Sequence, residues 1–240
     1  MRVLLTPKWL LSHLFVLAMI VAMVNLGFWQ LSRLDERRES NAAIVAAVEQ
    51  PAIDLADVDE SSTPVDYSVV TASGRYLQGQ ELLVANRSFE GASGSWMVTP
   101  LDLGDGRIVV VVRGWVPRLT LAGVDERPTD APIGDVIVEG LAFESVDGGR
   151  VAVVDEGEIP QLSRMDLDRY EEVTGLDVMD RWLRLRTQVP PQSGDLPVPV
   201  PAPPLDQGPH LSYAFQWFSF SVGTAVVYGL ILRRTRQSSS

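Results

Sequence analysis

The sequence contains no cysteine, only two histidines, and a single lysine beside nineteen arginines. The absence of cysteine excludes disulfide bonds, thiol chemistry and thiolate metal sites. Both histidines, His13 and His210, lie in apolar stretches near the two ends of the chain. The long region between these stretches therefore lacks the histidine that a Ser–His–Asp triad or a histidine-rich zinc site requires. We expect no hydrolase centre and no structural metal there.

The two apolar stretches cover residues 10–31 and 211–232. Each is close to the roughly 20 residues that a helix needs to cross the hydrocarbon core of a bilayer. The first stretch is too long for the apolar region of a signal peptide and is not followed by a small-residue cleavage site. We therefore predict two transmembrane helices, the first of them uncleaved.

Basic residues predict the orientation of these helices. Arg2 and Lys8 precede the first span, and the basic segment 233–236 follows the second, whereas Arg33 and the arginines at 37–38 lie on the opposite side. Because the larger group belongs on the cytoplasmic side, both termini are predicted to be cytoplasmic. The protein is then expected in a bacterial plasma membrane, with its central part outside the cytoplasm.

The two predicted transmembrane helices divide the chain into seven successive segments. They are a cytoplasmic N-terminus (1–9), transmembrane helix 1 (10–31), a helical extension (32–50), an extracytoplasmic β-rich domain (51–189), a proline-rich linker (190–209), transmembrane helix 2 (210–232) and a cytoplasmic basic tail (233–240).

The central domain is acidic and rich in short β-prone runs. All 31 acidic residues fall between Asp35 and Asp206, a charge that disfavours binding to nucleic acid or to anionic lipid. Runs such as "YSVVTASGRYL" and "RIVVVVRGWV" alternate with glycine-rich turns, which predicts an antiparallel small barrel or sandwich. One helix interrupts the strands, with Ser163 or Asp166 as its cap and Gly175 as its end. The fold class is therefore a membrane protein with an α+β outer domain.

Nothing in the domain indicates catalysis. The paired carboxylates are spread over turns and helix faces, as in a solvated surface. The glycine turns "GDGR" and "DGGR" have no following Gly-Lys-Ser/Thr, so they do not indicate a phosphate-binding loop. We expect a protein that is not an enzyme.

Four blocks in order carry a family resemblance: "LGFWQLSRLDERRESN", "ELLVANRSFEGASGSWMVTPLDL", "VVVVRGWVP" and "HLSYAFQWFSF". Together they resemble the surfeit locus protein 1 family, the assembly factors of haem-copper cytochrome c oxidase. The likeness spans nearly the whole chain. It departs from the family where "DERR" follows the first arginine and where the loop before the second span is rich in proline.

The resemblance implies a role in maturing the catalytic subunit of the oxidase, by assisting the insertion of haem A. The catalytic subunit is then the principal partner, and the haem A synthase and a respiratory supercomplex are further candidate partners. The alternative is a permanent accessory subunit of the oxidase or of the supercomplex. The preference for arginine over lysine is typical of a high-GC bacterial genome.

The resemblance also implies that His210 is a haem ligand. Tyr213 and Trp217 share its helix face at helical spacing, while Trp29 and Arg33 lie at a similar depth on the first span. These residues supply what a haem requires: an axial nitrogen, aromatic walls and a cation for the propionates. The alternative is simple anchoring, because aromatic residues and arginines also gather at membrane interfaces.

A second group of residues is predicted to contact a partner protein. It comprises Gln30, Arg87, Arg113, Trp115, Ser219 and Gly223. The serine and the glycine form a small-xxx-small pair, which marks either contact between the two spans or a face for the oxidase. The alternative is that this span simply has low hydrophobicity. For the two arginines of the domain the alternative is pairing with the abundant acidic residues.

Overall fold

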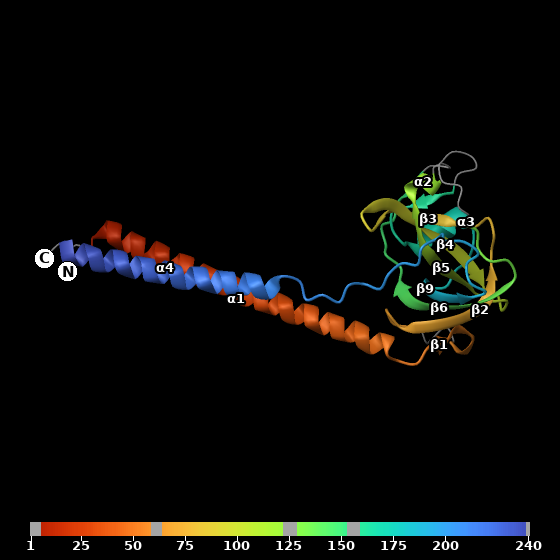
Figure 1. The fold of residues 1–240 in the computed structure, drawn as a ribbon, viewed down its shortest axis with the longest axis horizontal. Helices are drawn as coiled ribbons and strands as arrows, with labels where there is room; N and C mark the ends of the chain where they lie inside the picture. The colour runs from red at the N-terminus through yellow and green to blue at the C-terminus, as the bar shows by residue number, and fades with distance from the viewer. Residues whose placement is uncertain (1–5, 59–63, 122–128, 153–158, 239–240) are drawn as a thin grey trace. The chain divides into compact units, whose positions relative to one another are not determined.

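The computed structural model describes residues 6–58, 64–121, 129–152 and 159–238. Two compact units make up the chain: one contains residues 44–203, and the other contains the flanking residues up to 43 and from 204 onward. The flanking unit consists mainly of the long helices α1 (Pro7–Val48) and α4 (His210–Ser238). The central unit contains all the strands (Figure 1).

Helix α1 continues well beyond its apolar stretch. Its apolar residues are followed by a charged segment of helix-forming composition, and the helix ends at Val48, shortly before Pro51. Because proline lacks the amide proton that a helix interior requires, it marks a natural stop. Helix α4 begins at His210, directly after Pro209, and extends into the basic segment at the C-terminus.

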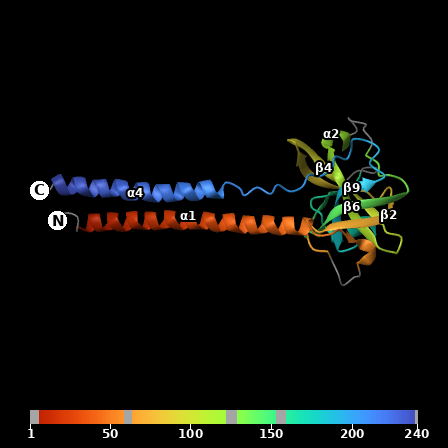
Figure 2. The ribbon, with the colours of Figure 1, turned by 60° about the horizontal axis from the view of Figure 1, so that its bottom comes forward.

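The two helices pack against each other in an antiparallel pair (Figures 1 and 2). Gly27 of α1 lies against Phe218 of α4, and a Cβ atom built on this glycine would stand only 2.5 Å from the phenylalanine ring. The ring of Phe28 meets the same phenylalanine edge-to-face, at a centroid distance of 5.4 Å. The glycine thus allows close approach, as small residues do between membrane helices.

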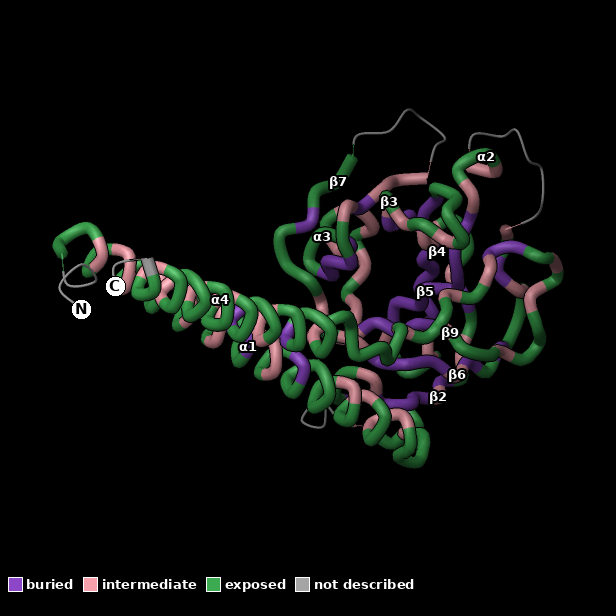
Figure 3. Tube along the Cα trace, turned by 60° about the vertical axis from the view of Figure 1, so that its left-hand side comes forward, coloured by how far each residue is buried: buried purple, intermediate pink, exposed green. Residues whose placement is uncertain are grey.

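Most residues of the helix pair are exposed (Figure 3), and many of the exposed ones are large and apolar. Phe15 is 62 % exposed and Val226 is 57 % exposed. Exposed apolar surface of this extent is unusual in a monomeric soluble protein. Both helices are long and apolar enough to cross a membrane, as the sequence predicts.

Within the described residues, nine strands form one sheet in the order β1-β2-β6-β9-β5-β4-β3-β8-β7. Their bounds are β1 (Ile53–Asp54), β2 (Val69–Tyr76), β3 (Leu82–Phe89), β4 (Ala92–Asp102), β5 (Ile108–Pro117), β6 (Asp135–Glu144), β7 (Val151–Ala152), β8 (Gln161–Leu162) and β9 (Arg181–Val189). An additional pairing joins Tyr76 of β2 to Leu101 of β4. This contact closes β2, β6, β9, β5 and β4 into a small barrel.

Strand β5 shows why the barrel has apolar residues on both faces. Val109 and Val111 belong to the cluster inside the barrel, whereas Val110 and Val112 belong to a second cluster on its outer face. Successive residues of a strand point to opposite sides, so an unbroken apolar run is expected when both faces are covered. The outer cluster is covered by helix α3 (Leu167–Thr174).

The boundaries of α3 agree with the sequence prediction. The side chain of Asp166 accepts a hydrogen bond from the amide of Arg169, which makes this aspartate the N-cap. The helix ends at Gly175, whose φ of 71° lies in the left-handed region that glycine adopts readily.

Two features of the predicted domain are wrong. The sheet is mixed rather than antiparallel, because β5 pairs in parallel with β9, β1 with β2, and β3 with β8. The domain also contains the short helix α2 (Arg118–Leu121) and the 3-10 helix η2 (Leu55–Asp57) besides α3. Turn residues indicate hairpins between neighbours in sequence, but they carry no information on pairing between distant strands.

The proline-rich segment 190–209 is partly built into the domain. Val198 exchanges two backbone hydrogen bonds with Trp115 of β5, at 2.6 and 2.8 Å. Leu196 is fully buried in an apolar cluster with Leu83 and Met97. The stretch up to Val198 is therefore a packed element of the domain and not a free spacer.

Candidate functional site

The histidine at the start of α4 is held by a side chain of α1. Nδ1 of His210 lies 2.8 Å from Oε1 of Gln30, a residue that the sequence assigned to a partner contact. In the tautomer that donates to this amide oxygen, which accepts hydrogen bonds only, Nδ1 carries the proton. Nε2 then keeps its lone pair, which is the form that binds a metal.

A turn before α4 adjoins the same ring. The side-chain amide of Asn41 donates to the carbonyls of Leu205 and Asp206, at 3.0 and 3.1 Å. The carboxylate of Asp206 in turn accepts from the amide of Gly208, at 2.8 Å. These bonds tie residues 205–208 to α1 within the helix unit.

Gly208 lies beside the histidine and has a positive φ of 67°. A Cβ atom at this position would stand 3.3 and 3.4 Å from Cδ2 and Nε2 of His210. The missing side chain therefore keeps room next to the free nitrogen. Sequence reasoning missed Asn41 and Gly208, although the "DQGPH" sequence contains the signal of a glycine turn before a helix.

The other residues of the predicted haem site lie near the same end of the helix pair. Tyr213 and Trp29 are 47 % and 54 % exposed, and Trp217 is half-buried beside the ring of Phe220. Arg33 forms an ion pair with Glu36 one turn further along α1. An exposed pair of this kind contributes at most about 1 kcal/mol, so the arginine can exchange its partner readily.

The second histidine belongs to a separate cluster at the opposite end of the helix pair. Nδ1 of His13 lies 2.7 Å from the hydroxyl of Tyr228, and that hydroxyl lies 3.0 Å from Oγ of Ser12. Each of the two histidines thus makes a hydrogen bond across the pair, at opposite ends of it. Sequence reasoning did not foresee the bond between His13 and Tyr228, because a register between two helices far apart in sequence has no local signal.

In the domain, Arg113, another predicted partner contact, is buried and hydrogen-bonded to its own chain. It is only 2 % exposed, and its Nη2 lies 2.7 to 2.9 Å from three acceptors: the carbonyls of Thr129 and Asp130 and the side-chain oxygen of Gln192. No carboxylate pairs with it among the described residues. Burial lowers the pKa of this guanidinium, although its ordinary value is so high that it stays charged.

Trp115 and Arg87, two further predicted partner contacts, bond within their own domain. Trp115 is 5 % exposed, and its indole nitrogen donates to the carbonyl of Arg87 at 2.9 Å. The guanidinium of Arg87 lies 4.2 Å above the ring of Trp96, and burial lowers its pKa. The buried tryptophan has no surface to offer, and the arginine stacks on a neighbour of its own domain.

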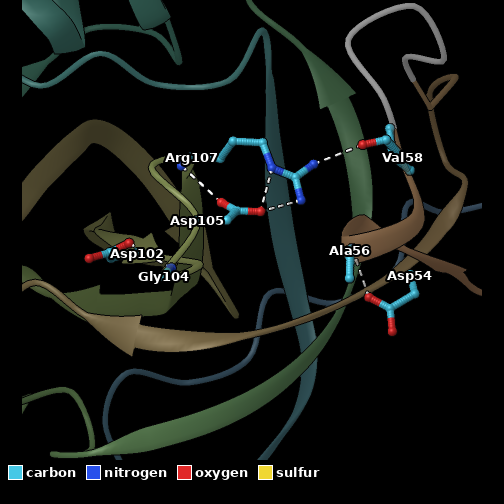
Figure 4. A network of polar contacts seen from close by, with 7 residues as sticks. All are labelled: Asp54, Ala56, Val58, Asp102, Gly104, Asp105 and Arg107. Atoms are coloured by element: carbon cyan, nitrogen blue, oxygen red, sulfur yellow. Dashed lines mark hydrogen bonds and ion pairs between the residues drawn. The ribbon is translucent and has the colours of Figure 1, made fainter.

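The domain contains a half-enclosed cavity of about 500 Å³ at one end of the barrel. Val109 and Leu183 form part of its floor, and Arg107 lies on its wall. The guanidinium of Arg107 donates to the carboxylate of Asp105 and to the carbonyl of Val58 (Figure 4). This hydrogen bonding holds the pKa of Asp105 below its usual range. The arginine thereby joins the turn at Asp105 to Val58, another residue of the cavity lining.

Among the residues that the structure describes, no cluster of three or more histidine, cysteine or acidic side chains could hold a metal ion.

Comparison with known proteins assigns the family. The model of the SURF1 family matches residues 17–222. A SURF1-like protein of Rickettsia felis is 25 % identical over 239 residues, which cover 93 % of this chain and 97 % of the relative. An uncharacterized SURF1-like protein of Mycobacterium tuberculosis is 28 % identical over 226 residues, which cover 91 % of this chain and 81 % of the relative. The match extends from the first helix through the domain into the second helix, and the chain belongs to the SURF1 family.

Proposed function

We propose that this protein is a non-enzymatic assembly factor for haem-copper cytochrome c oxidase, and that it presents haem A to the catalytic subunit. The observation that carries the proposal is the hydrogen bond between Gln30 and His210. It joins two of the blocks that define the family resemblance, and it leaves Nε2 of the histidine able to bind iron. Membership of the family supports the wider role in oxidase assembly.

In this proposal the residues near the start of α4 and the facing part of α1 have separate roles. His210 binds the iron, Tyr213 and Trp217 contact the porphyrin face, and Trp29 adds an aromatic wall from α1. Arg33 exchanges Glu36 for a propionate, since both partners are carboxylates. A single protein ligand holds haem less firmly than two would, which suits a carrier that must release its cargo.

The site requires a membrane setting. The two helices are of spanning length, and their exposed apolar side chains need a lipid environment. We place both termini in the cytoplasm, because the arginines at the end of α4 outnumber the basic residues at its start. His210 then lies at the outer surface of a bacterial plasma membrane.

The proposal is tested by making the protein in cells that synthesise haem A and measuring the haem that co-purifies. We expect His210→Ala to lose the haem and His13→Ala to keep it. The helix pair has many apolar contacts, so both variants should still insert and fold. Haem at the wild-type level in the His210→Ala protein would refute the ligand role.

A native gel distinguishes the factor from a permanent subunit. An assembly factor migrates with the oxidase only in small, substoichiometric amounts, and its partners include immature catalytic subunit. Stoichiometric migration with the mature oxidase would instead support the accessory subunit.

A further inference from the structure

A groove runs along the surface of the α1/α4 pair and includes Tyr228 of the His13 cluster in its lining. It has a volume of about 500 Å³ and is lined by Val16 and Met23 of α1 and by residues of α4 from Ser219 to Ile231. At 1.5 Å per residue these α4 positions extend over roughly 18 Å. Gly223 lies in the middle of the groove, and a Cβ atom built on it would meet no other atom within 4 Å.

The groove continues the helix face on which His210 stands. From His210 the spacing of three and four residues leads to Tyr213 and Trp217, and then to Phe220, Thr224, Val227 and Ile231, which line the groove. Residues at this spacing share one face of a helix. A ligand bound through the histidine, with its body against Tyr213 and Trp217, would therefore reach the groove without leaving that face.

The lining selects a long apolar group. Thr224 is engaged with Met23 of the opposite helix, and the hydroxyl of Tyr228 is engaged with Ser12 and His13. The remaining surface offers aliphatic and aromatic carbon with small residues at its centre. Such a surface gains dispersion contacts from a flexible chain that follows the helix axis, and it offers no counter-charge to an ion.

We propose that this groove binds the isoprenoid chain of the haem, so that the protein recognises a farnesylated haem by its tail. This inference rests on the proposed haem ligation by His210. The order of the residues along α4 supports this proposal. The porphyrin ring would lie beside the first two turns of the helix, and the groove for the tail begins at Ser219. Binding of the tail then distinguishes a farnesylated haem from one without a tail, which a single iron ligand cannot do.

The test compares haem O, which carries the farnesyl tail, with haem B, which does not. Each is titrated into the full-length protein in detergent and followed by its Soret absorption. The variant Gly223→Leu fills the groove, and Gly229→Leu is the matched control, because Gly229 is equally open but does not line the groove. We expect haem O to bind the wild type about tenfold more tightly than haem B, a difference of about 1.4 kcal/mol.

Gly223→Leu should abolish this preference by weakening haem O binding alone, and Gly229→Leu should retain it. Equal affinity of the wild type for the two haems would overturn the tail site while leaving ligation by His210 intact. An unchanged preference in Gly223→Leu would also overturn it and would assign the groove to lipid or to a partner's helix. If neither haem binds, or if His210→Ala binds both normally, the proposed function itself fails.

Discussion

Oε1 of Gln30 and Nδ1 of His210 lie 2.8 Å apart, although 180 positions separate the two residues in the chain. The bond links the end of the apolar part of α1 to the first residue of α4. In the tautomer whose Nδ1 donates to the glutamine, Nε2 is the nitrogen that is available to a ligand. Partners that orient a ligating histidine affect binding strongly although they never touch the metal.

We therefore predict that Gln30→Leu lowers haem affinity by about 10- to 100-fold, as is typical for the loss of an orienting partner. Gln30→Glu retains an acceptor at the same place and should restore most of the affinity. Haem titration followed by the Soret band measures both, and the band position reports whether the histidine still ligates. Equal loss in the two variants would indicate that the glutamine acts only in packing.

The predicted orientation can be tested because the chain has no cysteine of its own. Cysteines at Ser93 in the domain and at Gln237 near the end of α4 both stand on exposed positions. A membrane-impermeant maleimide should label Ser93→Cys in intact cells, and should label Gln237→Cys only after lysis. The reverse pattern would place His210 on the cytoplasmic side and contradict the proposed topology.

Two leucines of the proline-rich segment serve as a test position and its control. Leu196 is fully buried, whereas Leu205 is 45 % exposed. Because a buried leucine leaves a cavity when it is truncated, Leu196→Ala should lower the free energy of unfolding of the domain by about 2–5 kcal/mol. Leu205→Ala should change it by no more than about 0.5 kcal/mol. Urea unfolding of the detergent-solubilised protein, followed by tryptophan fluorescence, measures the two values.

The burial of Tyr76 predicts how the stability of the domain changes at alkaline pH. Its hydroxyl donates to Gln188 at 2.9 Å, and burial raises its pKa above the ordinary value, an effect that nearby Arg113 only partly opposes. The folded state therefore keeps this proton above pH 10, where the unfolded chain releases it. The stability from this residue is complete below about pH 10 and decreases as the pH rises toward the folded pKa, by at most about 1.4 kcal/mol per pH unit.

Tyr76→Phe should consequently cost about 1 kcal/mol at neutral pH, through the lost hydrogen bond, and should make the alkaline decrease less steep. Urea unfolding at a series of pH values up to 12 measures both effects. If the stability of the variant falls as steeply above pH 10 as that of the wild type, another group causes the alkaline loss of stability.

Much of the local structure could be predicted from the sequence. The two long apolar helices follow from two long apolar stretches, and the end of α1 follows from Pro51. The cap of α3 at Asp166 and its end at Gly175 follow from the properties of those two residues. The run of valines in β5 indicates a buried strand. Each of these signals acts within a few residues, so no knowledge of the fold is required to recognise it.

The tertiary structure alone decided the contacts between distant segments. Nothing near Arg113 in sequence indicates that it is buried against the carbonyls of Thr129 and Asp130 and not exposed to a partner. The parallel pairing of β5 with β9 likewise depends on how the chain closes the barrel. The contact of Gln30 with His210 also depends on the tertiary structure. The register between α1 and α4 is decided by side chains that meet only after folding.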